Sequence, residues 1–138
     1  MIKFRAWDKV QKVMMVPRDI QTDSDGNIFY VEAMGPDGEY DEGDLDVFKL
    51  EQFTGLEDVN GKDIYIGDVV KAWSDMSELT MEPTVNEIVS EDSVGRPGMF
   101  LKPVGKHLTE LCLHAFWGNQ FEVIGNVHEN PELLEEDK

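Results

Sequence analysis

The sequence is poor in cysteine and has no long apolar run. Cys112 is the only cysteine among 138 residues, so no disulfide can form within the chain. A single cysteine suits a reducing compartment, and we expect a cytoplasmic protein. No apolar stretch approaches the roughly 20 residues that span a bilayer, and the first residues lack the apolar core of a signal peptide. Membrane insertion and secretion are therefore not expected. A chain of this length buries roughly two-thirds of its unfolded surface, which suffices for folding without a disulfide or a metal.

Basic residues are also scarce. The chain has 12 Lys and Arg against 29 Asp and Glu, a formal net charge of −17. The stretch Thr22–Phe48 holds nine acidic residues and no basic one. Sequence-independent binding to nucleic acid depends on basic groups that displace counterions from phosphates, so direct binding to DNA or RNA is not expected. Two interpretations remain: the acids keep the protein soluble, or they form a surface that engages a basic partner, as a mimic of nucleic acid would.

Residue patterns of known chemistry are missing as well. His107, Cys112 and His114 have neither zinc-finger spacing nor the spacing of a helical zinc site. The acidic run 39–46 fails as part of a twelve-residue calcium loop, because glycine and glutamate are absent from the positions that need them. We expect neither a metal nor a cofactor. An enzyme would have to combine carboxylates from distant parts of the chain, which a sequence cannot display, so catalysis is the less favoured hypothesis.

Period-two alternation and β-branched runs predict a mainly β protein. In the N-terminal half these patterns indicate strands at 2–7, 12–16, 27–34 and 46–53. Pro17 should end the second strand because it has no N–H for a ladder, and 39–46 is predicted to be an acidic loop. The segment 46–53 also admits one helical turn. Trp7, on the first strand, is interpreted as a core or interface residue in preference to a ligand platform.

The stretch 52–71 joins the two halves and is rich in turn signals. Asn60-Gly61 tolerates positive φ at both positions and predicts a tight turn. Tyr65 lies in the short extended run that follows. Gly67-Asp68 should end this run, and the β-branched Val69-Val70 should begin a new strand. We therefore expect a junction between two β-rich halves here.

Beyond this junction the same patterns predict strands at 68–73, 84–90, 99–104 and 121–128. Gly125 is expected to mark a bulge or a close approach in the last strand. The segment 107–117 fits both a helical stripe and an alternating strand, with the strand slightly preferred beside its β neighbours. Asn130-Pro131-Glu132 has the residue types found at a helix start. A short terminal helix should follow and end near residue 136.

Three segments stand out as a set. They are Ile2-Lys-Phe-Arg-Ala-Trp-Asp, Phe53-Thr-Gly-Leu-Glu-Asp-Val-Asn-Gly-Lys-Asp-Ile-Tyr-Ile-Gly-Asp-Val-Val and Phe121-Glu-Val-Ile-Gly-Asn-Val-His-Glu-Asn-Pro-Glu-Leu-Leu. In this order they resemble the YopX family of phage and prophage proteins, whereas the regions near 19–45 and 74–117 match no pattern. We take as its structural signature Trp7, Gly55, Asn60, Gly61, Tyr65, Gly67, Asp68, Gly125, Asn130 and Pro131.

The resemblance implies a small phage-encoded protein whose C-terminal part is an SH3-like barrel, and it supplies no catalytic residues. We expect a β-rich N-terminal lobe at 1–51 and a barrel lobe with the short helix at 52–138. The expected function is that of a phage or prophage accessory protein in the bacterial cytoplasm, which binds a basic host or phage protein or self-assembles into a homo-oligomer. The alternatives are an enzyme that pairs distant carboxylates and an acidic mimic that engages a basic nucleic-acid-binding host protein.

Overall fold

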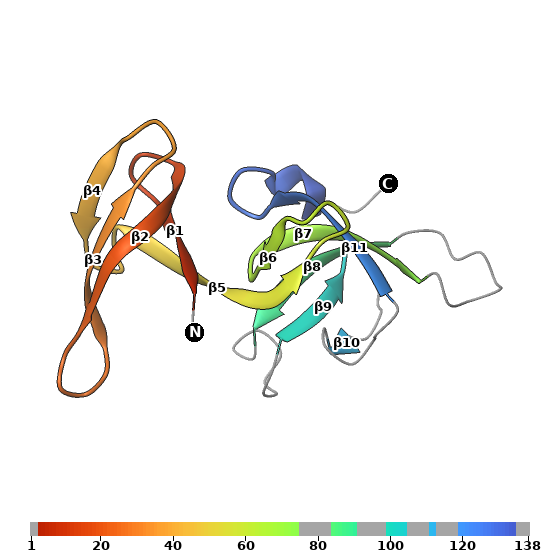
Figure 1. Ribbon diagram of the computed structural model, residues 1–138, viewed down its shortest axis with the longest axis horizontal. Coiled ribbons are helices and arrows are strands. Elements are labelled where there is room, and N and C mark those ends of the chain that lie inside the picture. The colour runs from red at the N-terminus through yellow and green to blue at the C-terminus, as the bar shows by residue number, and fades with distance from the viewer. Residues whose placement is uncertain (1–2, 75–83, 91–98, 105–110, 113–118, 135–138) are drawn as a thin grey trace. The chain divides into compact units, whose positions relative to one another are not determined.

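Antiparallel strands make up most of the described chain, which confirms the mainly β prediction. The computed structural model describes residues 3–74, 84–90, 99–104, 111–112 and 119–134. The chain forms two units, Met1–Phe53 and Thr54–Lys138. Each unit has its own apolar core, and Figure 1 shows the strands of both units.

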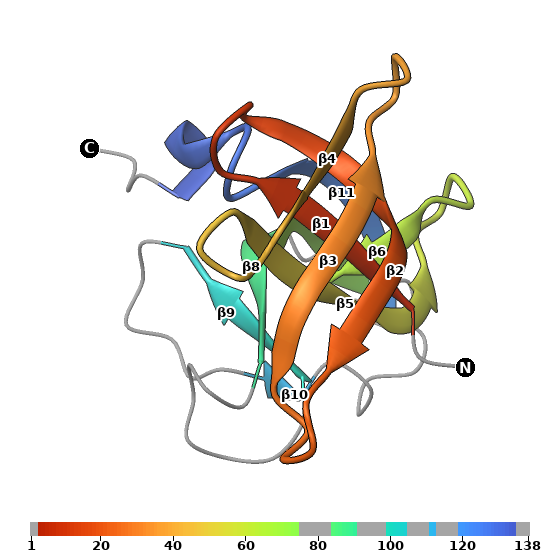
Figure 2. The same cartoon turned by 90° about the vertical axis from the view of Figure 1, so that its left-hand side faces the viewer.

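The N-terminal unit is a curled antiparallel sheet. Its strands are β1 (Phe4–Asp8), β2 (Val13–Thr22), β3 (Ile28–Met34), β4 (Tyr40–Gly43) and the first part of β5 (Phe48–Glu57). They lie in the order β4-β3-β2-β1-β5, and each neighbouring pair is antiparallel. Figure 2 looks onto β2, β3 and β4. Within the segment 46–53, residues 48–53 belong to strand β5, and residues 46 and 47 lie in the turn before it.

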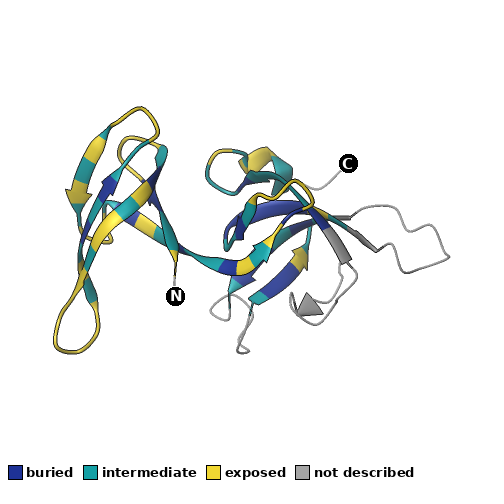
Figure 3. Ribbon diagram, viewed as in Figure 1, coloured by how far each residue is buried: buried dark blue, intermediate teal, exposed yellow. Residues whose placement is uncertain are grey.

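Alternating side chains divide this sheet into a core face and an outer face. Successive residues of a strand point to opposite sides, so every second side chain can enter the core. The core side chains are Ala6, Met15, Val31, Ala33 and Phe48. Figure 3 shows the resulting alternation of buried and more exposed residues along β3.

Two local predictions for this unit are wrong. Strand β2 does not end at Pro17 but continues to Thr22, with a register shift between Pro17 and Asp19. Proline is tolerated because β1 pairs with β2 only from Val13 to Met15, so beyond Met15 β1 requires no N–H from β2. The run 39–46 is not wholly a loop, because Tyr40–Gly43 forms β4 against β3.

The C-terminal unit holds a second antiparallel sheet. Besides the end of β5 and the short strand β6 (Asp63–Tyr65), which neighbours it, the strands are β7 (Asp68–Ser74), β8 (Thr84–Ser90), β9 (Met99–Pro103), β10 (Leu111–Cys112) and β11 (Asn119–Asn126). Their order is β10-β9-β8-β7-β11. The core consists of Ile64, Val70, Ile88, Leu101 and Phe121. The SH3-like barrel implied by the family resemblance stays a prediction.

Two remaining predictions concern the C-terminal third. Within 107–117, residues 111–112 form strand β10, and the other positions, His107 and His114 among them, lie outside the described residues. The predicted terminal helix begins at Pro131 but is a 3-10 helix, η2 (Pro131–Leu134). No helix in the described part of the chain is long and apolar enough to cross a membrane.

Candidate functional site

The signature turn 58–62 is organised by one carboxylate. Asp58 Oδ1 accepts hydrogen bonds from the backbone N–H groups of Asn60 (2.8 Å) and Lys62 (2.9 Å). Asp58 Oδ2 accepts a third from Val123 N–H of β11 at 2.9 Å. Gly61, with φ of 80°, adopts the left-handed conformation that this turn needs. Asp58 therefore ties a local turn to a strand 65 residues away.

The environment of Asp58 keeps it charged. Burial disfavours the charged form, but the amide hydrogen bonds from Val123, Lys62 and Asn60 and the nearby charge of Lys62 outweigh burial, so the pKa of Asp58 lies below its usual value. Both carboxylate oxygens of Asp58 accept hydrogen bonds from backbone N–H groups, so its role is structural.

Gly67 and Asp68 form a second junction. Gly67 N–H donates to Ile88 O and Gly67 O accepts from Val127 N–H, both at 2.9 Å. Its φ of 95° is in the region that favours glycine. The buried Asp68 accepts a hydrogen bond from Tyr65 N–H at 2.8 Å, which closes the bend between β6 and β7. These residues thus join β8 to the end of β11.

The third junction lies at the end of β11. The register with β7 shifts between Val123 and Gly125. Asn130 Oδ1 accepts a hydrogen bond from Asn126 N–H at 3.3 Å, so the side chain turns back toward β11. An added Cβ at Gly125 would lie 2.5 Å from this Oδ1 and 2.8 Å from Leu133 Cδ1. Glycine at this position avoids a close approach to these two side chains.

Gly125→Ala should therefore lower the free energy of unfolding by about 1–2 kcal/mol, because Asn130 and Leu133 must move. Urea denaturation followed by circular dichroism measures this. In an Asn130→Ala background the same substitution should cost less, because the nearer obstacle is gone. An equal cost in both backgrounds would show that Asn130 is not the obstacle.

The remaining signature residues complete this picture. Trp7 is buried on β1 of the N-terminal unit. Gly55 lies in β5 with φ of 89°. Pro131 opens η2. The structure brings the other signature residues to the turns and strand junctions of the C-terminal unit.

A carboxyl pair in the N-terminal unit was not found from the sequence. Asp8 Oδ1 accepts hydrogen bonds from Val10 and Gln11 N–H, both at 2.9 Å, and Asp8 is fully buried. Among the described residues its Oδ2 has no hydrogen-bond partner, and the Asp41 carboxyl is close enough to act on the pKa of Asp8. A proton shared by the two carboxyls would supply the missing donor. Burial and the Asp41 carboxyl raise the pKa of Asp8, while the Asp8 carboxyl lowers the pKa of Asp41.

Asp8→Asn should make the protein more stable at pH 7, by about 1 kcal/mol, because an amide retains the acceptor and supplies the donor. A carboxyl with a raised folded-state pKa stabilises the fold at low pH, and this contribution is lost as pH rises from about 4 through the folded-state pKa. The wild type should therefore approach the variant on acidification. Thermal melts of both proteins between pH 4 and 8 measure the difference; a variant less stable at pH 7 would contradict the shared proton.

The outer face of β2, β3 and β4 carries two neighbouring rows of side chains. The register aligns Val16, Met34 and Tyr40 as one row and Asp19, Glu32 and Glu42 as the next. We call these the apolar row and the carboxylate row. Val16 is 68% exposed and Tyr40 is 51% exposed, so apolar surface is open to solvent beside three acids. Neither row could be assembled without the register, because it draws on three separate strands.

Two tyrosines hold one acid of the carboxylate row. Tyr30 and Tyr40 hydroxyls donate to the same oxygen, Glu42 Oε2, at 2.6 and 3.0 Å. These hydrogen bonds lower the pKa of Glu42 and raise the pKa of both phenols. Glu42 is thus ionised at neutral pH and held by the hydroxyl groups of two tyrosines.

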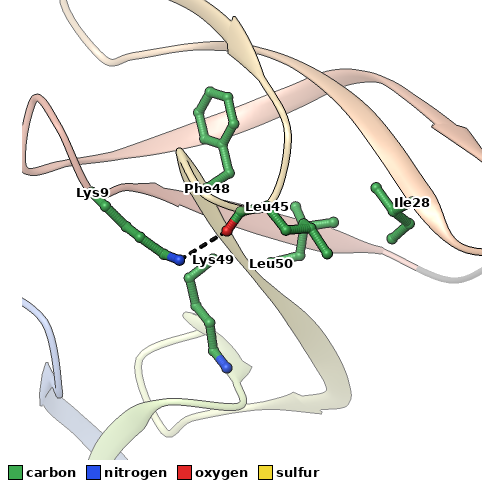
Figure 4. A pocket seen from close by; sticks show the side chains of 6 residues that line it. All are labelled: Lys9, Ile28, Leu45, Phe48, Lys49 and Leu50. Atoms are coloured by element: carbon green, nitrogen blue, oxygen red, sulfur yellow. Dashed lines mark hydrogen bonds between the residues drawn. The ribbon is translucent and has the colours of Figure 1, made fainter.

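A shallow hollow of about 310 Å³ opens elsewhere on the N-terminal unit. Its lining residues are Lys9, Ile28, Leu45, Phe48, Lys49 and Leu50 (Figure 4). The Lys9 ammonium donates to Leu45 O at 2.9 Å, and in Figure 4 the Lys49 side chain extends away from the apolar wall. Ligand sites combine an apolar wall with several converging polar groups. Of the two lysines that line this hollow, Lys9 is already hydrogen-bonded and Lys49 extends away, so their charged groups do not converge.

Together, the fold and these surfaces define a small β protein whose signature residues hold turns, with an acidic and aromatic outer face. The chain belongs to the YopX family, because the family model described as "YopX protein" matches residues 3–135. Within the described residues no group of three His, Cys, Asp or Glu could hold a metal ion.

Two solved structures are similar over nearly the whole chain. Protein EF1440 from Enterococcus faecalis is 26% identical, with a TM-score of 0.64 over 98% of this chain and 99% of its own. Protein yopX from Bacillus subtilis is 22% identical, with a TM-score of 0.60 over 96% of this chain and 97% of its own. No curated protein matches the chain.

Proposed function

We propose that this chain is a phage or prophage accessory protein that acts by binding a basic protein through the outer face of its N-terminal unit. The observation that supports this function is the exposed apolar row directly beside the carboxylate row. Exposed apolar surface rimmed by polar groups is typical of protein-binding sites. The net charge of −17 steers positively charged proteins toward it.

The edge of the sheet favours a different protein over self-association as the partner. Strand β4 lies at one end of the sheet, where a second copy could add a strand. Glu42 N–H, however, donates to Asp41 Oδ1 at 2.9 Å, so one edge donor is already used. Acidic side chains on an edge also repel an identical edge. The homo-oligomer expected from the sequence stays a prediction.

The paired carboxylates do not support the enzyme alternative. Asp8 and Asp41 have opposed pKa shifts, as catalytic dyads do. Asp8 is nonetheless fully buried, and its Oδ1 already accepts two backbone N–H groups. A substrate in solution cannot reach Asp8, so the pair is not placed for catalysis.

An affinity experiment with two baits tests the proposed function. The wild type and the double variant Val16→Ser/Tyr40→Ser would each be used to capture proteins from a bacterial lysate at 50 and 300 mM salt. We expect a basic protein that is retained by the wild type at low salt and lost by the variant. A protein retained equally by both baits, or no retained protein, would refute the outer face as the binding surface.

A further inference from the structure

The carboxylate row brings like charges together, with the Tyr30 hydroxyl 3.2 Å from Glu32 Oε2 and 2.6 Å from Glu42 Oε2. Glu32 lies directly opposite Glu42 on one side and directly opposite Asp19 on the other. Like charges that face each other across neighbouring strands are destabilising. No ion pair joins any of these three acids to a residue in the described part of the chain. Asp19 Oδ2 accepts a hydrogen bond from Gln21 at 2.8 Å, which supplies no charge. A cation placed on this row would pair with carboxylates whose side-chain partners among the described residues are neutral hydroxyl and amide groups.

Aromatic rings stand on both sides of this row along the strands. Tyr40 precedes Glu42 by two residues on β4, and Tyr30 precedes Glu32 by two residues on the antiparallel β3. The two strands run in opposite directions, so the rings approach the row from opposite ends. Their hydroxyls meet at Glu42 Oε2. The other oxygen, Oε1, receives neither of these hydrogen bonds.

We propose that this cluster is the anchor site for an arginine side chain of the basic partner, which lies as an extended segment across β2, β3 and β4. The inference rests on the proposed function and names the group that the outer face recognises. The guanidinium pairs with Glu42 and Glu32 and stacks on the tyrosine rings, while an apolar neighbour in the same segment packs on the apolar row.

Arginine fits this cluster better than lysine. Its planar guanidinium can pair with carboxylates through two parallel hydrogen bonds while its face lies on an aromatic ring. Lysine offers a compact, strongly hydrated ammonium. The face of a tyrosine ring attracts a cation, and the attraction grows once the partner excludes water.

Peptide binding to the full chain tests the anchor. The probes are fluorescein-labelled acetyl-(Arg-Leu)4 amide and the same peptide with lysine or citrulline in place of arginine, measured by fluorescence anisotropy at 50 and 200 mM salt. We expect the arginine peptide to bind about fivefold more tightly than the lysine peptide and the neutral citrulline peptide to bind at least tenfold more weakly.

Matched variants locate the site. Glu32→Gln/Glu42→Gln removes two charges from the carboxylate row and should weaken arginine-peptide binding about tenfold. Asp25→Asn/Asp46→Asn removes two charges from turns outside the row and should change binding less than about twofold. Tyr40→Ala should weaken binding about threefold, whereas Tyr40→Phe keeps the ring and should restore it. Thermal melts establish that each variant is folded.

Each outcome bears on the proposal. If both double variants lost the same affinity for the arginine peptide, the peptide would be attracted by the overall charge only, and the proposed anchor site would be wrong. Equal binding of the arginine and lysine peptides, or an unaffected Tyr40→Ala, would overturn the arginine anchor while leaving a basic partner in place. If no basic peptide binds but the lysate experiment retains a protein through Val16 and Tyr40, the anchor fails and the proposed function stands.

Discussion

Asp58→Ala should lower the free energy of unfolding by about 3 kcal/mol. The substitution removes the acceptor of three backbone N–H groups, and one of them, on Val123, belongs to a distant strand. Hydrogen bonds to a charged group contribute about 1.5–3 kcal/mol each, and a buried N–H left without a partner costs about 1–3 kcal/mol. Urea denaturation followed by circular dichroism at pH 7 measures the loss.

A neighbouring acid provides the control for Asp58. Glu57 is exposed, so Glu57→Ala should change stability by less than about 0.5 kcal/mol. Asp58→Asn, which keeps one acceptor oxygen, should fall between these values. Since the pKa of Asp58 is depressed, its contribution is present above about pH 4 and is lost as pH falls through the folded-state pKa. The gap between wild type and Asp58→Ala should therefore narrow in acid; a constant gap would show that the charge is irrelevant.

Phe48→Ala should destabilise the N-terminal unit by about 3–5 kcal/mol. Phe48 is 1% exposed and packs in the core of that unit with Ala6, Met15 and Val31. Removing a buried ring loses its transfer free energy and leaves a cavity that the sheet fills only in part. The hollow that Phe48 lines would deepen. Urea denaturation followed by the fluorescence of Trp7, with the other tryptophans replaced by phenylalanine, reports the unfolding of this unit.

The same unit offers a second phenylalanine as a control. Phe29 lies on β3 and is 53% exposed. Phe29→Ala removes the same atoms from a site that is already half in water, so it should cost less than about 1 kcal/mol. Similar losses for the two variants would contradict the division into a core face and an exposed end of the sheet.

Local signals in the sequence predicted local structure well. Asn60-Gly61 marked the turn that Asp58 holds, and alternation along 27–34 marked β3. These features depend on residues near one another in the chain, whose backbone preferences act wherever the segment lies.

Features that depend on a distant strand were missed. Pro17 lies within β2 because β1 does not pair with that part of β2. The residues around Pro17 do not indicate how far β1 extends along β2. The apolar and carboxylate rows exist only in the register of three strands. The contact between Asp8 and Asp41 requires the curl of the sheet, since β1 and β4 are not neighbours in it. The place of Pro17, the two rows and the proximity of Asp8 to Asp41 all depend on tertiary structure, which the local sequence does not encode.

The register shift in β2 gives its two halves separate constraints. Before the shift, Val13–Met15 pairs with β1 and contributes Met15 to the core; after it, Asp19–Thr22 pairs only with β3. Residues added or removed two at a time in the β2–β3 hairpin would keep every side chain on its own side. The β2–β3 hairpin can thus change in length while the pairing of β2 with β1 and the place of Met15 in the core stay the same.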